Sequence, residues 1–130
     1  MERKPIAAGG FAQVYRGVYK GLKVAVKQMH HFLQDTEARA AVYVERFKGE
    51  AEMMSRLHHP NIQALLGVTI NPLCLVTEFA PYGSLSDPED RRLSPNATIR
   101  VLYQVACGMK FLHARKPSIS HRDLNPNNIL

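Results

Sequence analysis

Residues 121–128 read HRDLNPNN, and this stretch is the most specific signal in the 130-residue sequence. It sets a carboxylate, Asp123, five residues before a carboxamide, Asn128, in a polar loop. A carboxylate can accept a proton, and an amide oxygen can bind a hard cation such as Mg²⁺. An ordinary polar loop after a helix is the alternative, so the interpretation depends on the rest of the chain.

A helix is predicted upstream of this loop. Ser94 can cap its first turn, and Pro95 suits the first helical position. Residues 81–92 are polar and rich in helix breakers, which indicates a connector before the helix. The apolar residues that recur at three- and four-residue steps, and that we expect to be buried, are Ile99, Leu102, Ala106, Met109 and Leu112.

The first 80 residues carry the patterns of a sheet. Apolar and polar residues alternate in short runs rich in β-branched side chains, and turn residues separate the runs. The strands are predicted within residues 6–11 (around Gly9 and Gly10), 13–28 (with a turn at Gly21), 62–70 and 73–79 (with Asn71 and Pro72 between them).

One helix interrupts these strands. Asp35 or Thr36 can cap its start, and the HHPN cluster at residues 58–61 stops it near Leu57. Its predicted apolar stripe consists of Val44, Phe47, Ala51, Met54 and Leu57. The expected fold class is α+β, with a five-stranded antiparallel sheet, one inserted helix, and further helical structure after residue 81.

Four stretches, in chain order, resemble the motifs of the protein kinase domain. They are IAAGGFAQV at 6–14, VAVK at 24–27, LVTEFAPYGSL at 75–85 and HRDLNPNN at 121–128. The resemblance covers essentially the whole chain and implies a kinase fold, with an amino-terminal lobe at 1–80 and the start of a helical carboxyl-terminal lobe at 81–130. The family's Asp-Phe-Gly segment would follow Leu130, so we expect an incomplete domain that is inactive alone.

The resemblance also implies roles for four side chains. Lys27 would reach the α and β phosphates of ATP and Glu50 would hold that lysine in place, while Asp123 would be the catalytic base and Asn128 a Mg²⁺ ligand. Glu52 is the alternative to Glu50. We favour Glu50 because it has the family's offset from the HPNI stretch that follows the helix.

The nucleotide site implied by the resemblance is built mostly from the first lobe. Backbone groups of Glu78 and Ala80 would bond the adenine edge, and Thr77 would stand at the back of the pocket. Ala7 and Ala12 replace two glycines of the family's phosphate-covering loop, so we expect slower nucleotide handling. The implied nucleotide-binding residues are Ile6, Ala7, Ala8, Gly9, Gly10, Phe11, Ala12, Val14, Ala25, Lys27, Thr77, Glu78 and Ala80.

The implied activity is transfer of the γ-phosphate of ATP, with Mg²⁺, to a hydroxyl of a protein substrate. The stretches EFAPYGSL and HPNI resemble the tyrosine-kinase-like group, most of whose members phosphorylate serine or threonine. Asn125 stands where such kinases usually carry a lysine, which removes a positive charge. The alternative function is a non-catalytic nucleotide-binding or scaffolding protein.

The composition limits the other function classes. The formal net charge of +6 is spread from Arg3 to Arg122, so nucleic acid is not an expected partner. No window approaches 18 consecutive apolar residues, so no membrane segment is expected. Cys74 and Cys107 lie in apolar surroundings without metal-ligand spacing, which indicates buried free thiols and a cytoplasmic location. The histidine pairs at 30–31 and 58–59 lack partner ligands for a metal site.

Overall fold

A computed structural model describes residues 2, 4–9, 12–29, 37–86 and 93–130, and of residues 37–40 the backbone alone. Several predictions fall outside these residues. They concern the cap at Asp35 or Thr36, the phosphate-loop residues Gly10 and Phe11, and the histidine pair at 30–31.

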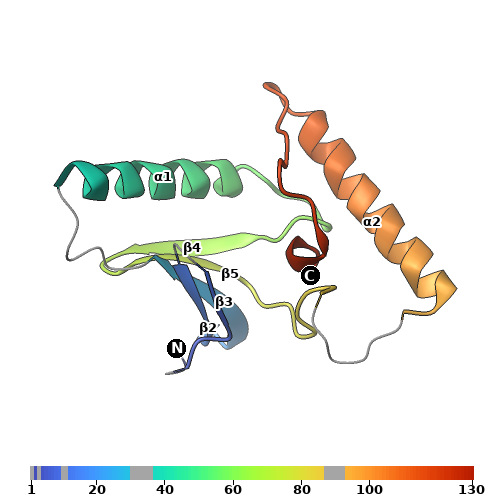
Figure 1. The fold of residues 1–130 in the computed structure, drawn as a ribbon, viewed down its shortest axis with the longest axis horizontal. Coiled ribbons are helices and arrows are strands. Elements are labelled where there is room, and N and C mark those ends of the chain that lie inside the picture. Colours follow the sequence, from blue (N-terminus) through green and yellow to red (C-terminus); the bar gives the residue numbers. More distant parts are fainter. Residues whose placement is uncertain (1, 3, 10–11, 30–36, 87–92) are drawn as a thin grey trace. The chain divides into compact units, whose positions relative to one another are not determined.

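The described chain forms a five-stranded sheet with two long helices (Figure 1). All paired strands are antiparallel, in the order β1-β2-β3-β5-β4, which confirms the predicted α+β fold with its five-stranded sheet. The elements are β1 (Ala7–Ala8), β2 (Ala12–Tyr19), β3 (Leu22–Met29), α1 (Glu37–Ser55), β4 (Leu65–Ile70), β5 (Leu73–Glu78), α2 (Pro95–His113) and the 3₁₀ helix η1 (Pro126–Asn128).

The fourth strand is shorter than predicted. We expected it to begin at residue 62, but β4 begins at Leu65. The Ala64 N–H donates to Glu78 Oε1 at 2.9 Å, and the Gln63 side chain donates to the Glu78 carbonyl at 3.0 Å. The Glu78 N–H still donates to the Ala64 carbonyl at 3.2 Å, but the Ala64 N–H bonds the Glu78 side chain in place of its carbonyl, so the regular ladder ends here.

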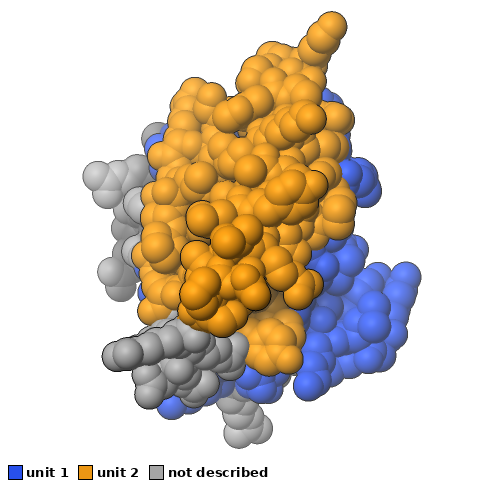
Figure 2. All heavy atoms as spheres, turned by 90° about the vertical axis from the view of Figure 1, so that its right-hand side faces the viewer, with its two compact units in different colours: residues 1–58, 63–79 blue, residues 59–62, 80–130 orange. Residues whose placement is uncertain are grey.

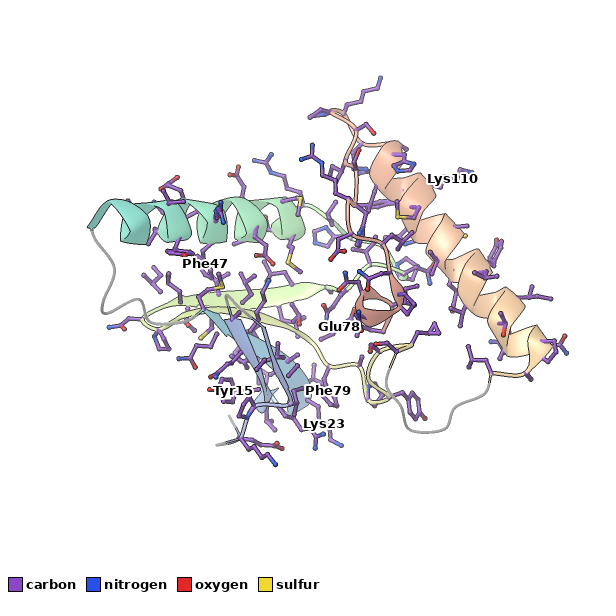
Figure 3. All side chains as sticks on the ribbon, viewed as in Figure 1. Tyr15, Lys23, Phe47, Glu78, Phe79 and Lys110 are labelled. Atoms are coloured by element: carbon purple, nitrogen blue, oxygen red, sulfur yellow. The ribbon has the colours of Figure 1, made fainter. Side chains whose placement is uncertain are left out.

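The first helix covers one side of the sheet, where α1 packs against β4. Phe47 points from α1 toward the sheet (Figure 3) and is only 5% exposed. Leu57, just beyond the helix, is buried too, so the predicted stripe is confirmed at both residues. The most deeply buried side chains of the sheet are Val24 and Leu75, both 1% exposed.

The second helix begins as predicted but buries a different stripe. Ser94 Oγ accepts the Ala97 N–H at 3.2 Å, so the predicted cap is confirmed. Leu112 is buried as expected, whereas Ile99 and Leu102 are 65% and 63% exposed, so their predicted burial was wrong, as was that of Ala106. The less exposed stripe consists of Ala97, Val101, Val105, Gly108 and Leu112. The helix is apolar on more than one side, so residue spacing alone could not choose between the stripes.

The chain divides into two compact units, drawn in blue and orange in Figure 2. Unit 1 comprises residues 1–58 and 63–79, and unit 2 comprises residues 59–62 and 80–130. The short segment 59–62 joins unit 2 through His59, whose ring lies 4.8 Å from that of Phe111 on α2. The Arg115 guanidinium also lies over the Phe111 ring, at 4.0 Å, so this ring contacts both the imidazole of His59 and a guanidinium group.

Gly108 on α2 allows this segment to approach closely, so Gly108→Ala should destabilise the protein. An added Cβ would lie 2.9 Å from the Asn61 carbonyl oxygen, a backbone atom that cannot swing aside. We expect a net loss of up to about 2 kcal/mol, because overpacking costs ~1–3 kcal/mol and alanine adds back ~1 kcal/mol of helix propensity. Urea unfolding measures the difference.

Gly49→Ala is the matched control, since no atom of the described residues lies within 4 Å of a Cβ added there on α1. This variant should gain about 0.5–1 kcal/mol from helix propensity alone. Equal shifts in the same direction for both variants would contradict the steric role of Gly108.

Candidate active site

In unit 1, Lys27 on β3 and Glu50 on α1 form an ion pair. The lysine Nζ lies 2.6 Å from Glu50 Oε1, and the two side chains are 40% and 34% exposed. Glu52, the rival partner considered from the sequence, pairs instead with Arg56 one turn along the helix. The pair thus ties the inserted helix to the sheet and restricts the flexible lysine stem.

Strand register places four predicted nucleotide-site residues on one face of the sheet. Lys27 pairs with Val14 across β2, and Ala25 pairs with Thr77 across β5. Residues opposite each other in adjacent strands share a face, as do residues two apart in one strand. Val14, Ala25, Lys27 and Thr77 therefore line the same side of the sheet. Thr77 is buried, at 7% exposed.

The hairpin between β1 and β2 closes through the backbone, since the Gly9 N–H donates to the Ala12 carbonyl at 2.9 Å. Ala7, Ala8 and Gly9 are exposed, and Ala12 is buried. Among the described residues, a Cβ added at Gly9 would meet the Ala12 oxygen, at 3.9 Å, which is ordinary contact.

The end of β5 is held by hydrogen bonds from the segment that precedes β4. Backbone groups of Glu78 were predicted to bond adenine, and the Glu78 carbonyl accepts from the Gln63 side chain at 3.0 Å. A carbonyl oxygen has two lone pairs, so it can still accept a second hydrogen bond. Ala80 is the first residue of the longer segment of unit 2, and its carbonyl accepts the Gly83 N–H at 3.3 Å.

In unit 2, Asp123 is held from several directions although it is exposed. Its N–H donates to His121 Nδ1 at 3.3 Å, so His121 serves as a hydrogen-bonding element of the loop. The Asn128 amide donates to Asp123 Oδ2 at 2.9 Å and to its carbonyl at 2.7 Å. Arg122, in the left-handed region with φ 64°, makes the sharp turn into this arrangement.

The side-chain oxygen of Asn128 is a suitable ligand for a hard cation. Both of its hydrogen bonds to Asp123 use Nδ2, which leaves the amide oxygen Oδ1 as the atom that can face a metal. Mg²⁺ prefers oxygen ligands and commonly takes one or two from the protein. The residues present at this position therefore fit the ion.

Sequence reasoning missed the part that Asn125 plays in this loop. The sequence indicated only that a positive charge is lost there, whereas the Asn125 amide donates to Asp123 Oδ1 at 2.8 Å. The available signal was the residue type, because asparagine side chains often bond groups two residues away in turns.

Both cysteines are free thiols, and Cys74 is buried as predicted. Cys107 on α2 is half-buried, and its hydrogen bond with Tyr103 raises the pKa of that phenol. Within the described residues, no three His, Cys, Asp or Glu side chains gather as metal ligands. Neither helix in the part of the chain that the structure covers is both long and apolar enough to cross a membrane.

Comparison with known proteins extends over the whole chain. A family model described as "Protein tyrosine and serine/threonine kinase" matches residues 1–130. The chain is 38% identical over 128 residues to Probable serine/threonine-protein kinase roco7 of Dictyostelium discoideum, which covers 96% of this chain and 5% of that protein. It is 44% identical over 129 residues to Mitogen-activated protein kinase kinase kinase 10 of Mus musculus, covering 96% of this chain and 13% of the relative.

A third relative, Mitogen-activated protein kinase kinase kinase of Drosophila melanogaster, is 40% identical over 130 residues, covering 98% of this chain and 11% of the relative. The chain thus spans a small part of the length of these relatives. The full-length family match and these identities agree with the motif order and with the sheet and inserted helix. The chain belongs to the protein tyrosine and serine/threonine kinase family.

Proposed function

We propose that this chain supplies the nucleotide-binding and catalytic-loop residues of a kinase that phosphorylates serine or threonine in proteins. The Lys27–Glu50 ion pair carries the proposal, because phosphoryl transfer in protein kinases requires this pair to be in place. The similarity to Probable serine/threonine-protein kinase roco7 of Dictyostelium discoideum supports the choice of acceptor. We assign residues 1–80 to the amino-terminal lobe and 81–130 to the carboxyl-terminal lobe.

ATP would lie against the sheet face that carries Val14, Ala25, Lys27 and Thr77. The ammonium of Lys27 would pair with phosphate oxygens, and Glu50 would keep that ammonium aimed correctly. Val14 and Ala25 would pack over the adenine ring. Backbone groups of Glu78 and Ala80 would hydrogen-bond its edge, and the hairpin of residues 6–12 would cover the phosphates.

The catalytic loop would act on the hydroxyl of the protein substrate. Asp123 would accept its proton as the oxygen attacks the γ-phosphorus, and ADP would leave with the electrons of the broken bond. Protein kinases use Mg²⁺ with ATP, and the ion neutralises charge that develops on the phosphates. Asn128 would hold it through Oδ1.

The motifs at 59–62 and 78–85 support the proposal that the protein is a member of the tyrosine-kinase-like group. A cytoplasmic location is part of the same proposal, supported by the free thiols of Cys74 and Cys107. A protein hydroxyl acceptor also fits a chain with no concentrated basic patch in its sequence.

A non-catalytic nucleotide-binding or scaffolding role is the second candidate, favoured by Ala7 and Ala12 in the phosphate-covering hairpin. The test is to measure nucleotide binding and phosphate transfer side by side on the native full-length protein. We expect Mg²⁺-dependent ATP binding together with labelled phosphoserine or phosphothreonine in a protein substrate. Binding without transfer would support the scaffold, and phosphotyrosine alone would overturn the assigned acceptor.

A further inference from the structure

We propose that Asn125 is a positioning residue that holds the carboxylate of Asp123 in its working orientation. The inference rests on the proposed function, because it concerns how the proposed base is presented to the acceptor hydroxyl. Asn125 occupies the place of a lysine in related kinases. The hydrogen bonds of its side chain indicate that residue 125 orients the Asp123 carboxylate, which requires an amide donor and not a charge.

Both ends of the Asn125 side chain are engaged. Its Nδ2 donates to Asp123 Oδ1 at 2.8 Å and to the Asp123 carbonyl at 3.2 Å. Its Oδ1 accepts the Asn127 N–H at 2.9 Å, which caps η1. A flipped amide would set its oxygen against the carboxylate and its NH₂ group against a backbone N–H, so the chemistry of the partners determines the orientation.

Asn128 completes the arrangement from the other carboxylate oxygen. Its Nδ2 donates to Asp123 Oδ2 at 2.9 Å, so each carboxylate oxygen has one amide donor. Rotation of the carboxylate about its side-chain bonds would break both contacts. A carboxylate has about four acceptor sites, so two remain for a substrate hydroxyl.

The two donors differ in what else they do. Asn128 is also the proposed metal ligand, so its replacement would alter the metal site and the base together. Asn125 is half-buried, and in the described part of the chain the hydrogen bonds of its amide run to the loop residues Asp123 and Asn127. It is therefore the residue at which orientation of the base can be tested by itself.

Asn125→Asp and Asn125→Ala separate positioning from capping. Aspartate keeps the side-chain oxygen that caps η1 but loses the amide donor and adds a negative charge beside Asp123. Alanine loses both the cap and the donor. If Asn125 positions the base, Asn125→Asp should lower kcat roughly 100-fold, and Asn125→Ala about 10- to 100-fold, the range expected for a misplaced catalytic group. KM for ATP should stay within about twofold in both, because neither variant changes a residue proposed to bind the nucleotide.

The measurement is steady-state phosphate transfer by the native full-length protein, with thermal unfolding of each variant as the check on folding. A merely structural cap predicts the opposite order: Asn125→Asp keeps kcat and Asn125→Ala loses it. That result, or an equal rise in KM for both variants with kcat unchanged, would overturn the inference.

Asp123→Asn, assayed in parallel, separates the positioning role of Asn125 from the proposed role of Asp123 as the base. Loss of transfer in Asp123→Asn with normal kcat in Asn125→Asp refutes positioning alone. Full kcat in Asp123→Asn refutes the proposed base, and the role of Asn125 with it.

Discussion

Replacing Asp123 with asparagine should lower kcat for phosphate transfer by about 10²- to 10⁴-fold, the usual contribution of a positioned general base. The variant is nearly isosteric and keeps the hydrogen bond from the Asn128 amide to the backbone carbonyl of residue 123, but its own NH₂ group would replace one of the two oxygens that accept from Asn125 and Asn128. It removes the carboxylate that would take the proton of the attacking hydroxyl. The exposure of Asp123 means that little stability depends on it, and ATP binding in unit 1 should be unchanged.

Glu52→Gln is the matched control for this experiment. It makes the same change of charge on the exposed side of α1, where Glu52 pairs with Arg56. Transfer by this variant should equal that of the wild type. If Asp123→Asn and Glu52→Gln showed the same phosphate incorporation, Asp123 would not be the base.

Replacing Lys27 with methionine should lower kcat/KM about 10²- to 10³-fold, comparable to losing one preorganised donor to a developing charge. Methionine keeps much of the length of the stem but removes the ammonium proposed to pair with the phosphates. The Lys27–Glu50 pair is partly exposed, and such pairs contribute little to stability, about 0–1 kcal/mol. The effect should therefore fall on catalysis and leave the unfolding midpoint almost unchanged.

Lys48→Met is the matched control for Lys27→Met, because it tests whether loss of any lysine ion pair on α1 lowers phosphate transfer. Lys48 pairs with Glu45 at 2.9 Å, and both side chains are more than 60% exposed, at 64% and 71%. We expect normal transfer from this variant.

Glu50→Gln should reproduce part of the Lys27→Met defect, since the lysine keeps its charge but loses its ion-pair partner. A Lys27→Met protein with unaltered kcat/KM would remove the main support for the proposed kinase activity.

Much of the fold could be predicted from local patterns. The turns at Gly21 and at Asn71 and Pro72 separate strands whose alternating residues identify them, and the structure contains each of these strands. The helix at α1 was predictable because apolar residues recur at three- and four-residue steps from Val44 to Leu57, and Phe47 and Leu57 are buried. The buried side of α2 was not, because that helix carries apolar residues on several sides.

The site divides in the same way. Lys27, Asp123 and Asn128 could be chosen because their spacing within short motifs is specific. The pairing of Lys27 with Glu50 required the helix and the sheet to be packed together, since Glu50 and Glu52 are only two residues apart. The part played by Asn125 depended on the loop backbone, where Arg122 turns the chain so that the Asn125 amide reaches Asp123.

By itself, then, the sequence determined the strands, the helix cap at Ser94, the chemical groups of the catalytic loop and the family to which they point. These features depend on residues close together in the chain, whose propensities and spacing can be read directly. Only the tertiary structure decided which glutamate meets Lys27, which stripe of α2 is buried and how Asn125 is used. Those outcomes depend on which segments approach one another, and on a single loop conformation chosen among several that the same residues allow.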